Sequence, residues 1–381
     1  MDQGCRARVD ASHAHGSHPI RYRPLVRTRF AWVGPRAGGG AVRVAINGFG
    51  RIGRQVMRAL VERQPLVEVA AMNDLTDLAT SAHMLKYDSN YGRYPDPVST
   101  GPNALVVGGK SIPYLQVKDW TQLPWLRLGV DVVIEATGVG TCRERAAAHL
   151  SAGAKKVLIT APSRDAHVTL VLGVNEDMYD PARHAVISNA SCTTNGLAPA
   201  LAVVHREFEV VKGLMSTIHA YTATQSLVDG PRADLHDARA AALNIVPTDT
   251  GAAKAIGLVI PELNGRMHGG AYRVPVPTVS IVEFVVQLKR RTTADAINKA
   301  LRAAADNGRL AGILAVSDEP LVSMDLKGSS YSSIVDAGST MVIGDDLAKV
   351  AAWYDNEWGY ACRVADVAAL IGAHVVSGAT A

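Results

Sequence analysis

The stretch of sequence that decides the fold is Val42-Arg43-Val44-Ala45-Ile46-Asn47-Gly48-Phe49-Gly50-Arg51-Ile52-Gly53-Arg54. Residues 42–46 are mostly apolar and predict a strand, and residues 47–54 contain the pattern G-x-G-x-x-G. A helix is predicted next, because four apolar residues recur at helical spacing: Ile52, Val56, Met57 and Leu60. A second strand, predicted over residues 67–72, ends at Asn73-Asp74. This order of strand, glycine loop, helix, strand and acid is typical of the mononucleotide-binding half of a Rossmann fold.

Each glycine of the loop has its own physical role in such a fold. Gly48 allows a tight turn, Gly50 lets backbone N–H groups approach a pyrophosphate, and Gly53 allows the helix to pack closely on the strand. Asp74 is predicted to accept hydrogen bonds from the ribose hydroxyls of an adenosine, with a buried capping role as the alternative. Because a carboxylate at that point repels a 2′-phosphate, the sequence favours NAD over NADP.

Strands continue to alternate with helices up to residue 191, which indicates an α/β domain with a parallel sheet. Strands are predicted over residues 130–136 and 156–160, with a helix over residues 144–153 between them. In a sheet of this kind the cofactor contacts come from the carboxyl ends of the strands. We therefore expect three residues that follow strands to contact the cofactor: Thr137, Gly138 and Thr160.

The pattern changes after residue 192. Strands are predicted over residues 213–221, 271–275 and 279–289, and helices over residues 252–260 and 294–305. A last helix is predicted over residues 357–371. This half of the chain therefore reads as an α+β domain with a mostly antiparallel sheet.

A candidate nucleophile lies between the two halves, in Ser188-Asn189-Ala190-Ser191-Cys192-Thr193-Thr194-Asn195. Cys192 follows an apolar strand predicted over residues 185–187 and precedes a helix predicted over residues 196–206. A helix N-terminus and an imidazole, here His219 in the next strand, can lower a cysteine pKa to roughly 6 or below and favour the reactive thiolate. Taken alone, Cys192 reads as a buried structural cysteine, and His219 as a core histidine.

Length, cysteines and charge narrow the class of protein. A chain of 381 residues can hold two domains, and four cysteines argue for a reducing compartment rather than a disulfide scaffold. No apolar run reaches the ~20 residues of a membrane helix. The net charge of +4 comes from residues 1–43, with eight arginines and two acids, so the rest of the chain gives no case for nucleic acid. Residues 1–40 read as a disordered tail, a start site placed too far upstream, or a transit peptide.

Five motifs together resemble the glyceraldehyde-3-phosphate dehydrogenase family. The resemblance runs from about residue 42 to about 372 and rests on residues 45–54, 188–195, 239–245, 273–275 and 353–360, the last reading Trp353-Tyr354-Asp355-Asn356-Glu357-Trp358-Gly359-Tyr360. It implies an NAD-binding Rossmann domain over residues 41–191 that is completed by 355–376, and a catalytic domain over 192–354. It also implies a cytoplasmic homotetramer, in which a loop over residues 222–246 reaches a neighbouring subunit.

The resemblance implies a reaction as well. Cys192 would attack the aldehyde of glyceraldehyde 3-phosphate, His219 would act as the base, and inorganic phosphate would take the acyl group from the sulfur as 1,3-bisphosphoglycerate. It implies substrate and phosphate contacts from Ser191, Thr193, Thr222, Thr250, Gly251 and Arg273. It implies cofactor contacts from Phe49, Arg51, Ile52 and Lys118, beside the residues named above, and from Asn356, which would orient the nicotinamide carboxamide. It implies no metal.

Five positions depart from the family pattern. Gly196 replaces a second cysteine, and His236 and Asp237 replace two arginines, one of which supports the site for inorganic phosphate. Gly230 replaces a larger apolar residue, and Tyr91 stands where the family often has histidine. Because an acid at position 237 would repel phosphate, an alternative assignment stays open. It is erythrose-4-phosphate dehydrogenase, a related enzyme that hydrolyses its thioester. A non-catalytic role in RNA binding or as a scaffold is the alternative from another class.

Overall fold

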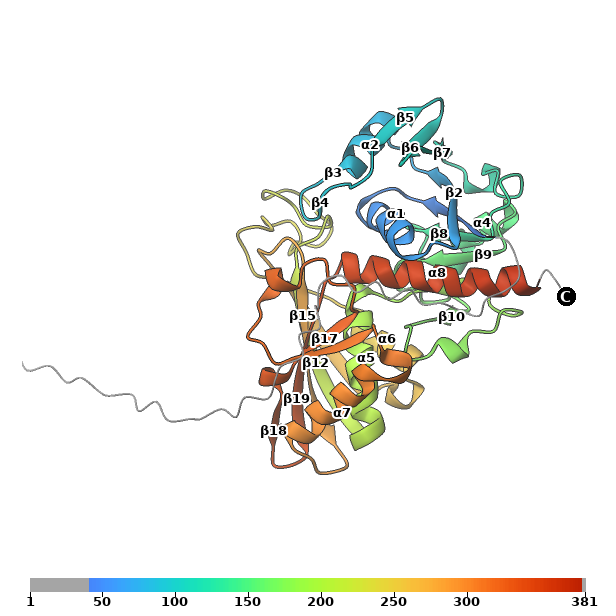
Figure 1. Cartoon of the computed structure of the whole chain (residues 1–381). Coiled ribbons are helices and arrows are strands. Elements are labelled where there is room, and N and C mark those ends of the chain that lie inside the picture. The colour runs from blue at the N-terminus through green and yellow to red at the C-terminus, as the bar shows by residue number, and fades with distance from the viewer. Residues whose placement is uncertain (1–40, 379–381) are drawn as a thin grey trace, which may run out of the picture.

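The computed structural model describes residues 41–378, so the predictions for residues 1–40 lie outside the described part. Two large sheets, each covered by helices, are stacked along the molecule, and the long helix α8 (Trp358–Gly378) runs between them (Figure 1). The predicted α/β half followed by an α+β half is confirmed. The boundaries between the two domains stay predictions.

The first sheet has nine strands in the order β10-β11-β9-β8-β1-β2-β7-β6-β5. It is parallel from β10 to β7, whereas β5, β6 and β7 form an antiparallel meander. Its strands are β1 (Val42–Asn47), β2 (Val67–Asn73), β5 (Val98–Gly101), β6 (Ala104–Val107), β7 (Lys110–Leu115), β8 (Val132–Glu135), β9 (Lys156–Ile159), β10 (Val168–Thr169) and β11 (Val186–Ser188). The same region contains α1 (Arg51–Arg63), α2 (Leu78–Lys86), α3 (Arg143–Ala146), α4 (Ala148–Ser151) and the hairpin β3 (Tyr87–Asp88) with β4 (Gly92–Arg93).

The second sheet has eight strands and is mostly antiparallel, with β12–β14 and β16–β17 as its two parallel pairs. Its strands are β12 (Val210–Ala220), β13 (Val246–Thr248), β14 (Met267–Val274), β15 (Ser280–Leu288), β16 (Leu314–Ser317), β17 (Ser333–Asp336), β18 (Met341–Ile343) and β19 (Leu347–Tyr354). The helices α5 (Cys192–Phe208), α6 (Ala252–Val259) and α7 (Ala294–Asp306) accompany it. Short 3-10 helices lie at Trp120–Gln122, Glu176–Met178, Pro261–Leu263, Gly308–Leu310, Ser323–Leu326 and Ala337–Ser339.

Two sequence-based assignments of elements are corrected. The helix predicted over residues 144–153 is two short helices, α3 and α4, which are joined at Ala147. The sequence does not predict the strands β3 to β7, β10, β13 and β16 to β19. They are short, or they mix polar and apolar residues, so that tertiary pairing rather than local periodicity defines them.

The last helix, α8, is longer than predicted and carries the chain back to the first sheet. It is long and apolar enough, by length and composition, to cross a membrane. Most of its residues are buried, and it packs on α1, β1 and α5. Its apolar composition is therefore accounted for by its place in the core.

Candidate active site

Cys192 is the first residue of α5, at the point where the chain leaves the first sheet. Strand β11 ends at Ser188, and Ala190 then takes a left-handed conformation (φ 54°) that turns the chain into the helix. Ser191 caps α5, because its Oγ accepts a hydrogen bond from the backbone N–H of Thr194 at 3.0 Å. The sulfur therefore lies at the positive end of the helix dipole, as the sequence predicted.

The thiol of Cys192 faces the imidazole of His219. Strand β12 points Met215, Thr217 and His219 inward, and it brings His219 Nε2 to 3.4 Å from Cys192 Sγ. His219 Nδ1 lies 2.7 Å from the carbonyl oxygen of Ala220, and since a carbonyl can only accept, Nδ1 carries the proton. Neutral His219 thus presents the lone pair of Nε2 to the thiol, which is the arrangement that a base for this cysteine requires.

The electrostatics of the pair differ from the sequence-based expectation. Burial raises the pKa of Cys192, against the opposing effects of the Arg273 charge and the Thr193 hydroxyl. Burial and Arg273 lower the pKa of His219 to about 3. The sequence-based expectation included the helix N-terminus and the imidazole, which lower a cysteine pKa. It did not include desolvation of the buried sulfur, which raises that pKa. The thiolate therefore has to form together with the imidazolium, by transfer of one proton across the pair.

The residues predicted to bind anions lie on β14, on α5 and at two loop positions. Arg273 on β14 is in register with His219 on β12 and donates from Nη1 to the Ala220 carbonyl at 3.4 Å. Its Nε is buried and has no hydrogen-bond partner within residues 41–378, so it is available to a ligand. Thr222 lies two residues beyond β12. Thr250 and Gly251 directly precede α6, and the Thr250 hydroxyl accepts a hydrogen bond from Ala252 N. Ser191 and Thr193 lie in the first turn of α5.

Tyr354 is a residue of this site that the sequence reasoning did not single out. Its buried hydroxyl lies 2.9 Å from Thr193 Oγ1 and 2.8 Å from Thr217 Oγ1, and its ring meets the His219 ring edge-on. A Cβ at Gly196 would come within 2.9 Å of the Tyr354 ring. The absence of the family's second cysteine therefore coincides with close packing of Tyr354 on α5.

The glycine loop has the geometry that a dinucleotide needs. Gly48 has a φ of 93°, and a Cβ there would lie 2.5 Å from the backbone N of Thr137. A Cβ at Gly53 would lie 2.0 Å from the carbonyl oxygen of Gly48, whereas one at Gly50 would point into open space. The open side at the N-terminus of α1 fits a pyrophosphate, so these residues fit NAD. Asp74 accepts from Phe49 N at 2.5 Å, which ties the second strand to the loop.

The side chain of Arg51 is already held by two carboxylates, which restricts the cofactor contact predicted for this residue. Its guanidinium is held by Asp88 and Glu357, and the two carboxylates raise its pKa despite burial. A cofactor contact from Arg51 is therefore expected from its backbone. The same holds for Phe49, because its side chain is buried. Ile52 is half-buried in the first turn of α1, and Lys118 is exposed beyond β7.

A buried carboxylate organises the strand ends beneath the loop, and sequence reasoning missed it. Glu135 at the end of β8 accepts hydrogen bonds from Asn47 Nδ2 at 2.5 Å and from the backbone N and hydroxyl of Thr137. His149 lies 3.1 Å from the same carboxylate, and Thr160 donates to the Glu135 carbonyl. Thr137 and Gly138 thus occupy the carboxyl edge of the sheet, as predicted. The sequence does contain a signal for Glu135, because an acidic residue ends an apolar strand two positions before Thr137-Gly138.

Asn356 is linked through one serine to the strand of the base. Ser280 Oγ donates to Asn356 Oδ1 at 3.0 Å and accepts from Ala220 N at 3.0 Å. Because Oδ1 is engaged as an acceptor, the Asn356 amide keeps Nδ2 as the donor for a ligand. Ser280, too, was missed by the sequence reasoning.

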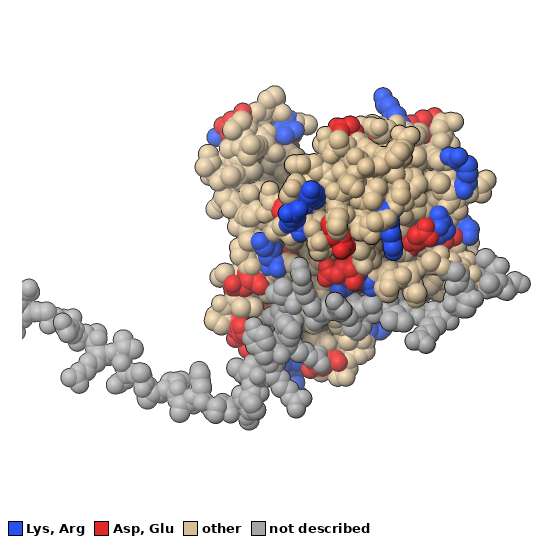
Figure 2. Space-filling model, turned by 45° about the horizontal axis from the view of Figure 1, so that its top comes forward, with Lys and Arg blue, Asp and Glu red and all other residues tan. Residues whose placement is uncertain are grey.

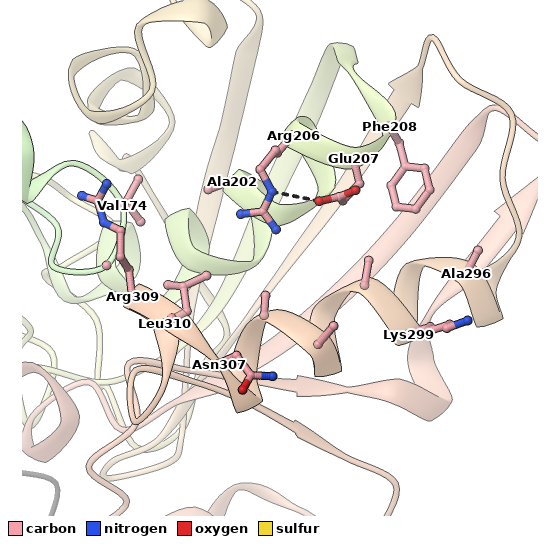
Figure 3. A pocket seen from close by; sticks show the side chains of 15 residues that line it. Val174, Ala202, Arg206, Glu207, Phe208, Ala296, Lys299, Asn307, Arg309 and Leu310 are labelled. Atoms are coloured by element: carbon pink, nitrogen blue, oxygen red, sulfur yellow. Dashed lines mark hydrogen bonds and ion pairs between the residues drawn. The ribbon is translucent and has the colours of Figure 1, made fainter.

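A cavity of 780 Å³ lies away from this site, between α5 and α7 (Figure 3). Its lining includes Ala202, Phe208, Ala300 and Leu310, with Lys299 at its edge. None of the predicted site residues lines it, and we assign the reaction to the Cys192 region because the cysteine–histidine pair lies there.

Within residues 41–378 no group of three or more His, Cys, Asp or Glu side chains is placed to hold a metal.

A Rossmann sheet with an open glycine loop and a cysteine–histidine pair define an NAD-dependent dehydrogenase that uses a cysteine nucleophile. Comparison with family models agrees in both halves. Residues 42–143 match the NAD-binding domain of glyceraldehyde 3-phosphate dehydrogenase, and residues 191–356 match its C-terminal domain.

Similar proteins extend over most of the chain. Glyceraldehyde-3-phosphate dehydrogenase of Geobacillus stearothermophilus is 56% identical over 331 residues, which cover 87% of this chain and 98% of the relative. The enzyme of Mycolicibacterium smegmatis is 54% identical over 338 residues, with the same shares covered. Glyceraldehyde-3-phosphate dehydrogenase 1 of Bacillus subtilis is 54% identical over 331 residues, again with the same shares. The chain belongs to the glyceraldehyde-3-phosphate dehydrogenase family.

Proposed function

We propose that this enzyme oxidises D-glyceraldehyde 3-phosphate to 1,3-bisphosphoglycerate, with NAD as the oxidant and inorganic phosphate as the acyl acceptor. The observation that carries the proposal is the 3.4 Å approach of Cys192 Sγ to His219 Nε2 at the N-terminus of α5. The names of the relatives support the choice of substrate.

The chain's own residues account for the acid–base chemistry. Cys192 Sγ attacks the aldehyde carbon as its proton passes to His219 Nε2, and the imidazolium then gives that proton to the aldehyde oxygen, which yields a hemithioacetal and neutral His219. Neutral His219 takes the hydroxyl proton back as hydride leaves the same carbon, and NAD, when bound, would be the hydride acceptor. Phosphate then attacks the thioester carbon and displaces the sulfur, which leaves Cys192 free for another cycle.

Two groups of donors suit the two phosphates. Arg273 and Thr222 are proposed to bind the substrate phosphate, since the buried Arg273 Nε needs an acceptor. Ser191, Thr193, Thr250 and Gly251 are proposed to bind the attacking phosphate. The latter group supplies hydroxyls and helix N-terminal N–H groups, and it lacks the arginine that Asp237 replaces.

We also propose a homotetramer in the cytoplasm. The loop over residues 222–246 exposes Leu227, Val228, Leu235, Leu243 and Ile245, and Leu227 is 82% exposed. Strand β12 adds Leu214 and Ile218 on the face away from α5. An apolar area of this kind favours association with other subunits. The free cysteines Cys142, Cys192 and Cys362 are consistent with a reducing compartment.

On the face in Figure 2, basic and acidic side chains are interspersed, which gives no support to an RNA-binding role.

NADH formation with and without phosphate tests the proposal. With D-glyceraldehyde 3-phosphate, steady-state NADH formation should require phosphate, and acyl phosphate should accumulate with it. Phosphate-independent turnover that yields the free acid, with erythrose 4-phosphate as the better substrate, would instead identify the hydrolysing relative.

A further inference from the structure

Residues 88–91, here called the connecting segment, join the two parts of the cofactor site. They link strands β3 and β4, in the part of the chain that holds the glycine loop. Their side chains reach residues 355–357, the turn between β19 and α8 that contains Asn356. Figure 1 shows β3 and β4 projecting from the upper sheet toward the lower one. The proposed function does not yet use these residues.

An ionic group forms the first connection. Arg51, at the start of α1, donates to Asp88 at 2.7 Å and to Glu357 at 2.6 Å. Asn90 Nδ2 donates to the same Glu357 carboxylate at 3.1 Å and to the carbonyl oxygen of Pro277 at 3.3 Å. The N-terminus of the pyrophosphate-binding helix is thereby tied to the turn that carries Asn356.

Tyr91 forms the second connection. Its hydroxyl donates to Asp355 Oδ1 at 2.7 Å and lies 3.1 Å from Thr278 Oγ1. The Tyr91 ring lies beside the Trp358 ring, with centroids 6.1 Å apart, and beneath the Arg51 guanidinium. Burial and the Asp355 carboxylate raise the pKa of Tyr91, so the phenol stays a hydrogen-bond donor.

Asp355 is the acceptor at the centre of the turn. It is buried, and its carboxylate also accepts from the backbone N–H groups of Gly328 at 2.8 Å and Trp358 at 2.9 Å. Asn356 follows it directly and is oriented by Ser280. The Tyr91 hydroxyl is thus the contact that the connecting segment makes with Asp355, which directly precedes Asn356.

We propose that Tyr91 is a positioning residue for the nicotinamide: by holding Asp355 from the connecting segment, it fixes the Asn356 amide relative to the pyrophosphate-binding helix. The inference rests on the proposed contact of Asn356 with the nicotinamide carboxamide. Its consequence is selective, because the adenosine and pyrophosphate contacts are expected from Asp74 and the backbone of the glycine loop. Tyr91 meets that loop at the Arg51 guanidinium, which two carboxylates already hold.

Binding of NAD and of ADP-ribose, which lacks the nicotinamide, tests the proposal. Titration calorimetry of the full-length Tyr91→Phe protein should show NAD binding weakened about fivefold, the size expected for one net hydrogen bond, and ADP-ribose binding changed less than twofold. Tyr94→Phe is the matched control: Tyr94 is a buried tyrosine of the same region whose ring packs against Arg58, and both ligands should bind as to the parent. Equal weakening of both ligands by Tyr91→Phe, or no change in either, would overturn the proposal.

Two further variants separate the possible failures. Asn90→Ala removes the neighbouring contact to Glu357 and should show the same selectivity, which keeps the inference testable if Tyr91→Phe does not fold. Asn356→Ala should also weaken NAD selectively. If it does not, the role proposed for Asn356 is wrong and the inference about Tyr91 fails with it. If Asn356→Ala is selective and Tyr91→Phe is not, only the inference about Tyr91 fails.

Discussion

At the scale of single residues, Cys192 combines a helix N-terminus, a neutral imidazole and a nearby guanidinium. Burial opposes ionisation of the thiol, and Arg273 favours it. The same guanidinium disfavours a charged His219. The two residues therefore share one proton, and reactivity depends on the pair rather than on either member.

Replacing the nucleophile should abolish the reaction. Cys192→Ser should lower NADH formation by about 10³-fold or more, since a hydroxyl is a far weaker nucleophile than a thiolate. In the parent protein, bound substrate should protect Cys192 against labelling by iodoacetamide. This protection should be absent in Cys192→Ser. The control is Cys142→Ser, which changes an exposed cysteine at the N-terminus of α3 and should keep the parent rate. Turnover that survives the loss of Cys192 would contradict the assignment.

Replacing the base should change the pH dependence as well as the rate. In His219→Asn the thiol loses its proton acceptor, and turnover should fall by roughly 10²- to 10⁴-fold. Because burial raises the pKa of Cys192, the rate of iodoacetamide labelling in this variant should rise steadily with pH above neutrality. Labelling across pH 6–10 checks this. A variant with the parent's labelling profile would show that His219 does not activate the thiol.

At the scale of elements, helix capping can be separated from catalysis. Thr293 caps α7, because its hydroxyl accepts from Ala296 N at 3.2 Å, and α7 lies remote from Cys192 on the outer side of α5. Thr293→Ala should destabilise the protein by about 1 kcal/mol and leave kcat unchanged. Denaturant unfolding and steady-state rates measure both. Ser99→Ala, on the exposed edge strand β5, is the control and should stay within about 0.5 kcal/mol of the parent.

The contribution of Asp88 to stability should depend on pH. Burial alone would raise the pKa of Asp88, but hydrogen bonds from Arg51 and from the backbone N–H groups of Tyr91 and Asn90 lower it. A carboxyl with a lowered pKa stabilises the fold above its unfolded pKa, near ~3.9, and loses that contribution as pH falls through the folded pKa. Asp88→Asn should therefore lower the free energy of unfolding at pH 7 and flatten its decline below pH 4. An unchanged profile in urea titrations at pH 3–7 would contradict this.

At the scale of the whole molecule, the unpaired apolar surface leads to a prediction about assembly. Leu214 is 64% exposed at the middle of β12, on the face opposite α5. Leu214→Asp should place an unpaired charge in the proposed subunit contact and shift the proposed tetramer toward smaller species. Light scattering after gel filtration measures the mass. Leu126→Asp is the control, since Leu126 is as exposed but lies beside the first sheet, and its mass should match that of the parent.

The fold could be predicted where local pattern and tertiary role coincide. Residues 42–60 alternate from strand to glycine turn to amphipathic helix, so local sequence already carries the geometry. The predicted strands over residues 213–221 and 279–289 match β12 and β15 closely for the same reason. Short edge strands such as β16 and β17 carry little periodicity of their own, and pairing with neighbours defines them.

The sequence by itself determined the glycine loop, the cysteine at a strand-to-helix junction and the histidine of the next strand, because each depends on residues close together in the chain. Only the tertiary structure decided the tautomer of His219, the hold of Glu135 on the cofactor edge, the turn of Arg51 toward Glu357 and the reach of Tyr91 to Asp355. These depend on contacts between residues up to 306 positions apart, as in Arg51 and Glu357. Burial, which sets the pKa of Cys192 and His219, likewise arises only when distant elements pack together.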